Sequence, residues 1–219
     1  MTDIDLHTHT RFFHQFEGHP TAFDEFGFRM NVAVARARNL DAIAVTNHDY
    51  FTSFDVDTGD LSIIPGIEVS TSEGHLLVIG PDPPERTVAG EPTPQETVTA
   101  AHDRDCAVVM AHPFRSGTVK DADVAVDAVE VNGKHPQNAP MIEVLASDRN
   151  LSLVGGSDAH YPIEVGRVVT TLSLEELSAE SVVSAIKTGN TDFRVVERFP
   201  DQYTQKLYAA IHRIKRGTS

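Results

Sequence analysis

Two histidines separated by one residue stand near the start of the sequence, in Asp5-Leu6-His7-Thr8-His9. On a β-strand, residues two apart point to the same side, so both imidazoles of this motif would face one way. Imidazole is a common ligand of zinc and similar metals. A His-x-His pair alone is weak evidence, because such pairs are more often exposed or hydrogen-bonded than ligating. Asp5 is suited to accept the second ring N–H of a ligating histidine.

Further histidines and two carboxylates stand at the ends of later apolar runs. They occur in Val45-Thr46-Asn47-His48-Asp49, Ile64-Pro65-Gly66-Ile67-Glu68, Gly74-His75-Leu76-Leu77, Val109-Met110-Ala111-His112-Pro113 and Gly155-Gly156-Ser157-Asp158-Ala159-His160. Each side chain alone is more readily explained as solvated or helix-capping. Cys106 is the only cysteine, which excludes a cysteine-rich zinc site and an internal disulfide. Together these segments indicate a metal site built from imidazole and carboxylate.

Four of these motifs resemble, in order, those of the polymerase and histidinol phosphatase (PHP) family. They are Asp5-Leu6-His7-Thr8-His9, Thr46-Asn47-His48-Asp49, Ala111-His112-Pro113 and Gly156-Ser157-Asp158-Ala159-His160. The resemblance spans residues 3 to about 190. It implies an α/β fold, a distorted seven-stranded, TIM-like (β/α) barrel, that carries two to three divalent metal ions.

The resemblance also implies the metal ligands. The first metal would take His7, His9, Glu68 and Asp158; the second Glu68, His75 and His112; the third His14, His48 and His160. The sequence departs from the family twice, both times at the third metal. Asn47 stands where an aspartate is more usual beside His48, and His14 stands where many short members have an aspartate.

This ligand set favours zinc, manganese or iron, because magnesium and calcium prefer oxygen ligands. Three divalent ions would outweigh the charge of two carboxylates, so the filled site would attract an anion. Such ions activate water and stabilise a phosphate's leaving group, so no serine or cysteine nucleophile is needed. We therefore expect a metal-dependent hydrolase that cleaves a small phosphate ester, a nucleotide-like phosphomonoester or phosphodiester.

Four residues near the motifs are candidates for substrate binding. Arg115 closely follows a ligand in His112-Pro113-Phe114-Arg115, where a guanidinium would grip phosphate, with a surface salt bridge as the alternative. His19, Lys134 and His135 are placed in loops after strands, where they would contact phosphate or protonate the leaving group. Ordinary solvation explains these three equally well.

Three other functions stay open. Similar short family members act as exonucleases from the 5′ ends of short oligonucleotides. A histidinol-phosphate phosphatase is a second alternative, although such members tend to be longer. The third is a metal-binding or regulatory module without catalysis, against which the complete ligand set argues.

The composition limits the partners. The formal charge is −14, from 32 acidic and 18 basic residues, whereas nucleic-acid-binding proteins normally carry a basic surface. We therefore expect a small substrate, at most a short oligonucleotide, and no long nucleic acid. The N-terminus has no signal-peptide pattern and no apolar run suits a membrane, so a cytoplasmic protein is expected. No oligomeric state can be predicted from this sequence.

The elements that would position the motifs alternate along one domain of 219 residues, with about residues 190–219 packed on it as an extension. Expected strands are Asp3–His9, Ala42–Asn47, Leu61–Val69, His75–Ile79, Ala107–Ala111, Ala128–Val131 and Leu151–Gly155. Expected helices are about Glu25–Asn39, Pro94–Asp105, Pro136–Arg149, Leu174–Thr188 and Gln202–Lys215, the fourth with a capping box of Ser173 and Glu176. Phe12–Phe28 and Gly80–Glu91 are expected to be loops.

Overall fold

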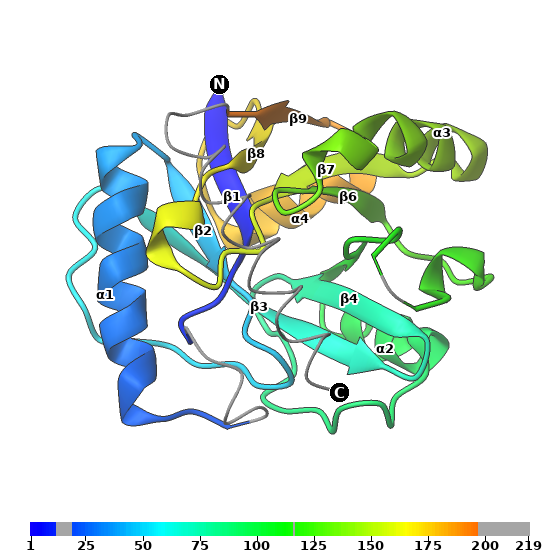
Figure 1. Cartoon of the computed structure of the whole chain (residues 1–219), viewed down its shortest axis with the longest axis horizontal. Helices are drawn as coiled ribbons and strands as arrows, with labels where there is room; N and C mark the ends of the chain where they lie inside the picture. The colour runs from blue at the N-terminus through cyan, green and yellow to red at the C-terminus, as the bar shows by residue number, and fades with distance from the viewer. Residues whose placement is uncertain (12–18, 116, 197–219) are drawn as a thin grey trace, which may run out of the picture.

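The computed structural model describes residues 1–11, 19–115 and 117–196 (Figure 1). Within them, nine strands form one sheet in the order β7-β6-β5-β4-β3-β2-β1-β8-β9. The strands are β1 (Thr2–Thr8), β2 (Ala42–Val45), β3 (Ser62–Thr71), β4 (Gly74–Ile79), β5 (Ala107–Met110), β6 (Ala128–Asn132), β7 (Ser152–Gly156), β8 (Val168–Leu172) and β9 (Thr191–Val195).

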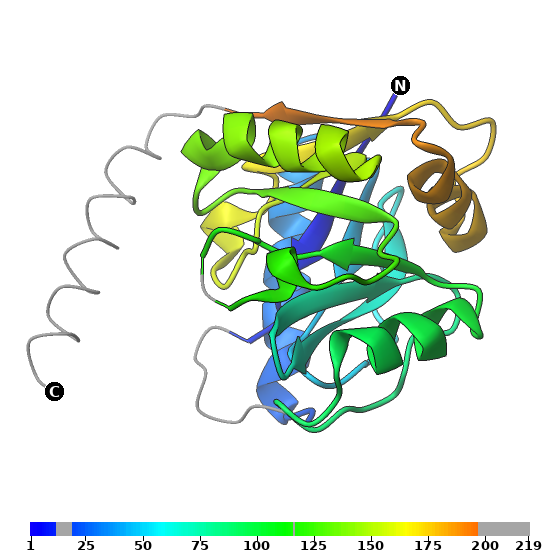
Figure 2. The same ribbon diagram turned by 90° about the vertical axis from the view of Figure 1, so that its right-hand side faces the viewer.

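The helices are α1 (Ala22–Ala37), α2 (Pro94–His102), α3 (Ala139–Arg149) and α4 (Ala179–Thr188), with short 3-10 helices η2 (Val119–Asp121), η3 (Pro136–Asn138) and η4 (Pro162–Glu164). Figure 1 shows α1, α2 and α3 around the outside of the curved sheet. The apolar faces of α2 and α3 share one buried cluster, and α1 covers another. The helix α4 lies apart from them (Figure 2) and packs on a third cluster, which includes alanines of β2 and β5.

All seven expected strands are present, but the expected barrel was only partly right. β8 and β9 add two strands, and the sheet is mixed. Only the pairs β1–β2, β2–β3, β5–β6 and β6–β7 are parallel, whereas β4 runs antiparallel to both of its neighbours and β8 runs antiparallel to β1 and β9. Both missed strands carry β-branched residues, which favour strands. None of the described helices combines the length and the apolar character needed to cross a membrane.

The sheet curls until β7 approaches β8, so that the barrel nearly closes. The hydroxyl of Thr170 on β8 accepts a hydrogen bond from the amide of Gly155 on β7 and donates one to its carbonyl, both at 2.8 Å. A Cβ atom on Gly155 would lie 2.6 Å from the carbonyl oxygen of Val169, so only glycine permits this approach. A side chain thus replaces the backbone ladder where the two strands meet.

Four expected helix boundaries were wrong by three residues or more: the starts of α1, α3 and α4 and the end of α2. α1 begins at Ala22, inside the expected loop, because Thr21 and Asp24 form a capping box. α4 is capped by Ser178 and Ser181, and not by the expected serine and glutamate further upstream, because Leu174 and Leu177 pack against the core before the helix begins. The expected helix Gln202–Lys215 lies outside the described residues.

Candidate metal centre

The His-x-His pair lies where β1 is bulged. Asp5 pairs with Ile43, but Thr8 pairs with Val45, so β1 has one more residue than β2 between these two positions. Such bulges re-aim side chains and are common next to active sites. The Nε2 atoms of His7 and His9 lie 3.1 Å apart, and both rings are buried. The expected common orientation of the two imidazoles is therefore confirmed.

Glu68 of β3 is the centre of the cluster. Its side chain is fully buried, and five histidines contact its two oxygens. Oε2 lies 3.1 Å from Nε2 of His7, 3.2 Å from Nε2 of His9 and 3.3 Å from Nδ1 of His48. Oε1 lies 2.6 Å from Nδ1 of His75 and 3.0 Å from Nε2 of His112. Each oxygen thus faces its own set of imidazoles, as expected of a carboxylate shared by two metals.

Asp158, just after β7, is the second carboxylate of the cluster. Its Oδ1 lies 3.5 Å from Nε2 of His9 and 3.1 Å from Nδ1 of His160. Arg115 donates to Oδ2 and Lys134 donates to Oδ1, both at 2.9 Å. The backbone of Asp158 is left-handed, with φ 52°, a conformation that aspartate tolerates better than most residues. The carboxylate therefore lies between the cluster and two cationic side chains.

The electrostatics keep both carboxylates ionised. Burial alone would raise the pKa of Glu68, but the nearby His48 and His7 outweigh it and hold the pKa well below its usual value. Burial likewise opposes ionisation of Asp158, whose pKa is held low chiefly by Lys134. Burial lowers the pKa of His160 to about 3. A charged carboxylate and a neutral imidazole are the forms that bind metals.

Two other rings respond differently. Burial lowers the pKa of His48 well below its ordinary value. The pKa of His7 is raised, because the charges of Glu130 and Glu68 outweigh the effect of burial. A proton would therefore compete with a metal cation for His7 more strongly than for His48.

Eight of the nine expected ligands come together, and His14 lies outside the described residues. Three groups have ligand atoms within 4.8 Å of one another: His7, His9 and Asp158; His48, Glu68 and His75; and His9, His48 and His160. The first group contains three of the four ligands of the first expected metal and lacks Glu68. The other two divide the residues differently from the family pattern, since His48 joins Glu68 and His75, and His9 stands beside His48 and His160.

The donor set fits divalent cations. A carboxylate oxygen and a ring nitrogen at 2.6–3.3 Å need a proton or a cation between them. Five imidazoles approach one buried carboxylate in this way, and one cation can satisfy several such pairs at once.

Asp5 does not have the expected role. Its carboxylate accepts hydrogen bonds from the amides of Ser157 at 2.9 Å and Gly166 at 2.6 Å, and from the Ser157 hydroxyl at 2.5 Å. The second ring nitrogen of His7 instead contacts Glu130, with 2.7 Å between Nδ1 of His7 and Oε1 of Glu130. His7 lies within the irregular stretch between Asp5 and Thr8, and Asp5 accepts a hydrogen bond from the backbone amide of His7 and not from its ring, so proximity in sequence misidentified the partner of the ring. In the sequence, Glu130 is marked by being the one charged residue in the stretch Ala128–Asn132, all of which is buried in the structure.

Glu164 of η4 is a residue that sequence reasoning missed, whereas Glu130, at the end of an expected strand, could be read from the sequence either as lining the site or as making an ordinary contact. Its buried Oε2 accepts the amides of His160 at 2.9 Å and Tyr161 at 3.0 Å. Its Oε1 accepts a hydrogen bond from Arg167 at 3.2 Å. The backbone that carries His160 is thereby fixed.

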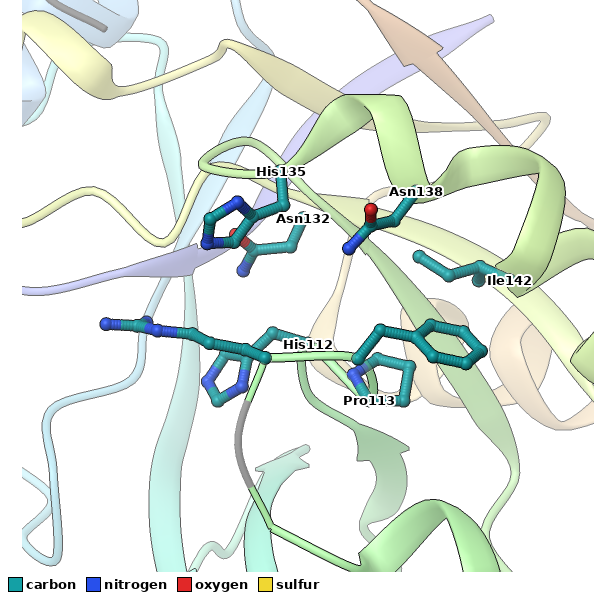
Figure 3. Close-up of a pocket in the computed structure, with 8 residues that line it drawn as sticks. His112, Pro113, Asn132, His135, Asn138 and Ile142 are labelled. Carbon is teal, nitrogen blue, oxygen red and sulfur yellow. The ribbon is translucent and has the colours of Figure 1, made fainter. Parts of the chain in front are cut away.

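Three of the four substrate-binding candidates lie at the cluster. Arg115 and Lys134 donate hydrogen bonds to Asp158. Arg115 and the nearby His135 also line a small pocket together with His112. Figure 3 shows His135, Asn132 and Asn138 on one side of this pocket and His112 on the other.

Lys134 and His19 differ in their surroundings. Nζ of Lys134 also lies 2.7 Å from Nδ1 of His160. His19 is exposed, and its carbonyl accepts a hydrogen bond from Arg11 near the start of α1. Among the described residues, no ring contact joins His19 to the cluster. The structure therefore supports placing Lys134 at the site, but not His19.

One family model matches the sequence. It is described as PHP-associated (PHP_C) and covers residues 140–191, from α3 to the start of β9. Among curated proteins, none matches the chain in sequence.

Several solved structures share the fold. The chain is similar to PsfC from Pseudomonas syringae PB-5123, with a TM-score of 0.73 and 21% identity over 94% of this chain and 97% of PsfC. It is also similar to a two-domain protein from Bacteroides vulgatus ATCC 8482 that contains a predicted PHP-like metal-dependent phosphoesterase, with a TM-score of 0.61 and 20% identity over 89% and 64% of the two chains.

A third similar structure is the lesion-specific endonuclease PfuEndoQ from Pyrococcus furiosus, with a TM-score of 0.61 and 18% identity over 88% of this chain and 57% of that one. An endonuclease Q complex with a 27-mer duplex that has an abasic lesion at the active site gives a TM-score of 0.64 and 18% identity over 87% and 58%. The chain thus spans less than two thirds of the two-domain protein and of endonuclease Q. At these identities the likeness is one of fold.

Proposed function

We propose that this chain, a member of the PHP family by its motifs, its PHP-associated segment and its fold, is a metal-dependent phosphoesterase. Its substrate would be a small phosphate ester, a nucleotide-like phosphomonoester or phosphodiester, cleaved by water. The observation that carries the proposal is Glu68, a fully buried carboxylate with five imidazoles around its two oxygens. A buried cluster of this kind is costly unless cations satisfy it.

Two to three divalent ions would be held by this cluster. We assign His7, His9, Glu68 and Asp158 to one ion, Glu68, His75 and His112 to a second, and His48 and His160, with His14, to a third. Zinc, manganese or iron bound there would supply the Lewis acidity that activates water and neutralises phosphate charge.

The side chains of this protein would bind and orient the substrate. Arg115 keeps one guanidinium nitrogen on Asp158, and its side chain is 35% exposed, so other N–H groups can reach a phosphate. Lys134 adds a second positive charge on the same carboxylate. Burial, with the nearby charge of Arg115, lowers the pKa of His135, which is therefore neutral at pH 7 and able to hydrogen-bond a substrate oxygen.

The test is hydrolysis by protein loaded with zinc, manganese or iron. We expect turnover of p-nitrophenyl phosphate, of its bis-ester or of a nucleotide, and loss of that turnover in the double variant His7→Ala, His9→Ala. His102→Ala is the matched control, because His102, the last residue of α2, pairs with Asp127 and is not one of the proposed ligands. Absence of turnover with every metal and substrate would refute the proposal, and bound metal without turnover would indicate the non-catalytic module.

Cleavage of nucleic acid is a second candidate function. The likeness to endonuclease Q, which binds a duplex with an abasic lesion, favours it and weakens our expectation that long nucleic acids are excluded. The charge of −14 still favours short oligonucleotides. Labelled trinucleotides and a 27-mer duplex, with and without an abasic site, separate the two cases. Release of single nucleotides from 5′ ends would indicate the exonuclease. Preferred hydrolysis of histidinol phosphate over these substrates would indicate the histidinol-phosphate phosphatase.

A further inference from the structure

We infer that Glu130 is a positioning residue that fixes ligands of two metals at once. The inference rests on the proposed function, because His7 and His112 are taken as ligands of different ions. Glu130 is not itself among the proposed ligands. It lies on β6, and its side chain is fully buried behind the cluster.

The carboxylate of Glu130 has three donors around it. Oε1 lies 2.7 Å from Nδ1 of His7. Oε2 accepts the backbone amide of His112 at 2.9 Å and the side-chain amide of Asn132 at 3.0 Å. The two amides donate to Oε2, and we infer that Nδ1 of His7 donates to Oε1, so that the site calls for a group that only accepts hydrogen bonds, which is an ionised carboxylate.

The contact with His7 determines which nitrogen can bind a metal. An imidazole that donates its Nδ1–H to Glu130 leaves the lone pair of Nε2 for a cation. Nε2 is the atom that faces the cluster, 3.1 Å from Oε2 of Glu68. Glu130 therefore holds His7 in the ligating tautomer and prevents rotation of the ring.

The contact with His112 fixes a backbone of unusual conformation. His112 has φ 30°, a left-handed value that is rare for a residue with a side chain and that costs about 1–3 kcal/mol. The hydrogen bond to its amide helps to hold this conformation, in which Nε2 reaches Oε1 of Glu68 at 3.0 Å. Glu130 thus acts on this histidine through the main chain, whereas it acts on His7 through the ring.

The neighbouring strand is built to admit the carboxylate. A Cβ atom on Gly156 of β7 would lie 2.4 Å from Oε1 of Glu130 and 2.5 Å from Cβ of His7. Any side chain there would push these two residues apart. Burying a carboxylate is unfavourable unless its partners compensate, and an apolar residue on β6 would fill the same space at lower cost. The arrangement is therefore explained by its effect on the ligands better than by stability.

The test compares Glu130→Gln with the unchanged protein in metal titrations. The amide of glutamine must direct its NH2 group at one of the donors, so the variant cannot accept all three hydrogen bonds. We expect zinc and manganese affinity to fall by about 10–100-fold at both sites that use His7 and His112. Asp127→Asn is the control, because this partly buried carboxylate before β6 accepts hydrogen bonds from His102 and the amide of Val108 and contacts none of the proposed ligands, so the variant should bind metal like the unchanged protein.

Nitrogen NMR of the metal-free protein provides an independent measurement. We expect a slowly exchanging proton on Nδ1 of His7 that is perturbed in Glu130→Gln and unchanged in Asp127→Asn. If Nδ1 carries no proton in the unchanged protein, or if Glu130→Gln binds metal with full affinity, the inference is overturned. If the unchanged protein binds no metal, the proposed function fails, and the NMR result still decides whether Glu130 sets the tautomer of His7.

Discussion

The ammonium of Lys134 lies 2.7 Å from Nδ1 of His160 and 2.9 Å from Oδ1 of Asp158. A positive charge of the protein thus stands beside two proposed metal ligands. An Nδ1 atom that accepts a proton from lysine leaves the other ring nitrogen protonated, and that nitrogen then cannot bind a metal. Lys134 and a cation on His160 therefore oppose each other.

Replacement of this lysine should strengthen metal binding. We expect Lys134→Met to raise zinc affinity about tenfold, or about 1.4 kcal/mol, because a nearby like charge is removed in a partly screened setting. The same variant should raise KM, since a phosphate contact is lost. Lys120→Met is the control, because Lys120 pairs with Asp121. Isothermal titration measures the affinity, and weaker zinc binding by Lys134→Met would contradict the prediction.

Glu68→Gln should remove more than one ion. Because both oxygens of Glu68 face imidazoles, an amide can serve only one of these sets. We expect elemental analysis to show at least one ion fewer per chain. Turnover should fall by at least about a thousandfold, or about 4 kcal/mol. A variant that keeps the full metal content would show that Glu68 is not shared between ions.

The stability of the protein should depend on Asp24 in a defined pH range. Burial opposes its ionisation, but hydrogen bonds from Tyr50 and Thr10 outweigh this and lower its pKa. A lowered folded-state pKa contributes stability above the unfolded pKa of about 4, and this contribution is lost as the pH falls through the folded value. We expect Asp24→Asn to cost about 2 kcal/mol at pH 7.

Denaturant titrations of both proteins at pH 7, 5 and 3 measure this dependence. The difference between the unchanged protein and Asp24→Asn should stay constant from pH 7 to 5 and shrink at pH 3. A difference that grows towards pH 3 would have the wrong sign for a lowered pKa.

Gly156→Ala should damage the metal site and the fold together. The added methyl group would overlap Oε1 of Glu130 and Cβ of His7, at a cost of about 1–3 kcal/mol. Metal affinity should fall as it does in Glu130→Gln. Gly189→Ala is the comparison, because Gly189 ends α4 with φ 73° and the alanine there meets only left-handed strain of about 1 kcal/mol. Equal metal affinity in both glycine variants would contradict the prediction.

Much of the metal centre could be predicted because most of its ligands stand near the ends of strands, although Glu68 lies inside β3. Residues such as His48, Glu68 and His112 follow apolar runs, and strand ends of a barrel converge in space. Alternation along one strand also predicted that His7 and His9 face the same way.

Other features depend on contacts between distant segments. Alternation cannot show that Glu130, far along the chain, meets His7 across the barrel. The bulge in β1 changes the alternation after Asp5, and only pairing with β2 reveals it. The antiparallel direction of β4 also depends on the tight turn between Thr71 and Gly74, which the pattern of strands and helices does not encode.

The place where β7 meets β8 has a consequence for the opening of the molecule. Among the described residues β7 and β8 share no backbone ladder, and the segment after β7 is joined to β1 by a single parallel bridge between Thr8 and Ala159, so the barrel is closed by few hydrogen bonds along this seam. His7 and His9 belong to one side of the seam, and Asp158 belongs to the other. A cation held by these three residues would link the two sides. Amides of β7 should therefore exchange with deuterium faster after treatment with a chelator, while those of α2, which carries no proposed ligand, keep their rate.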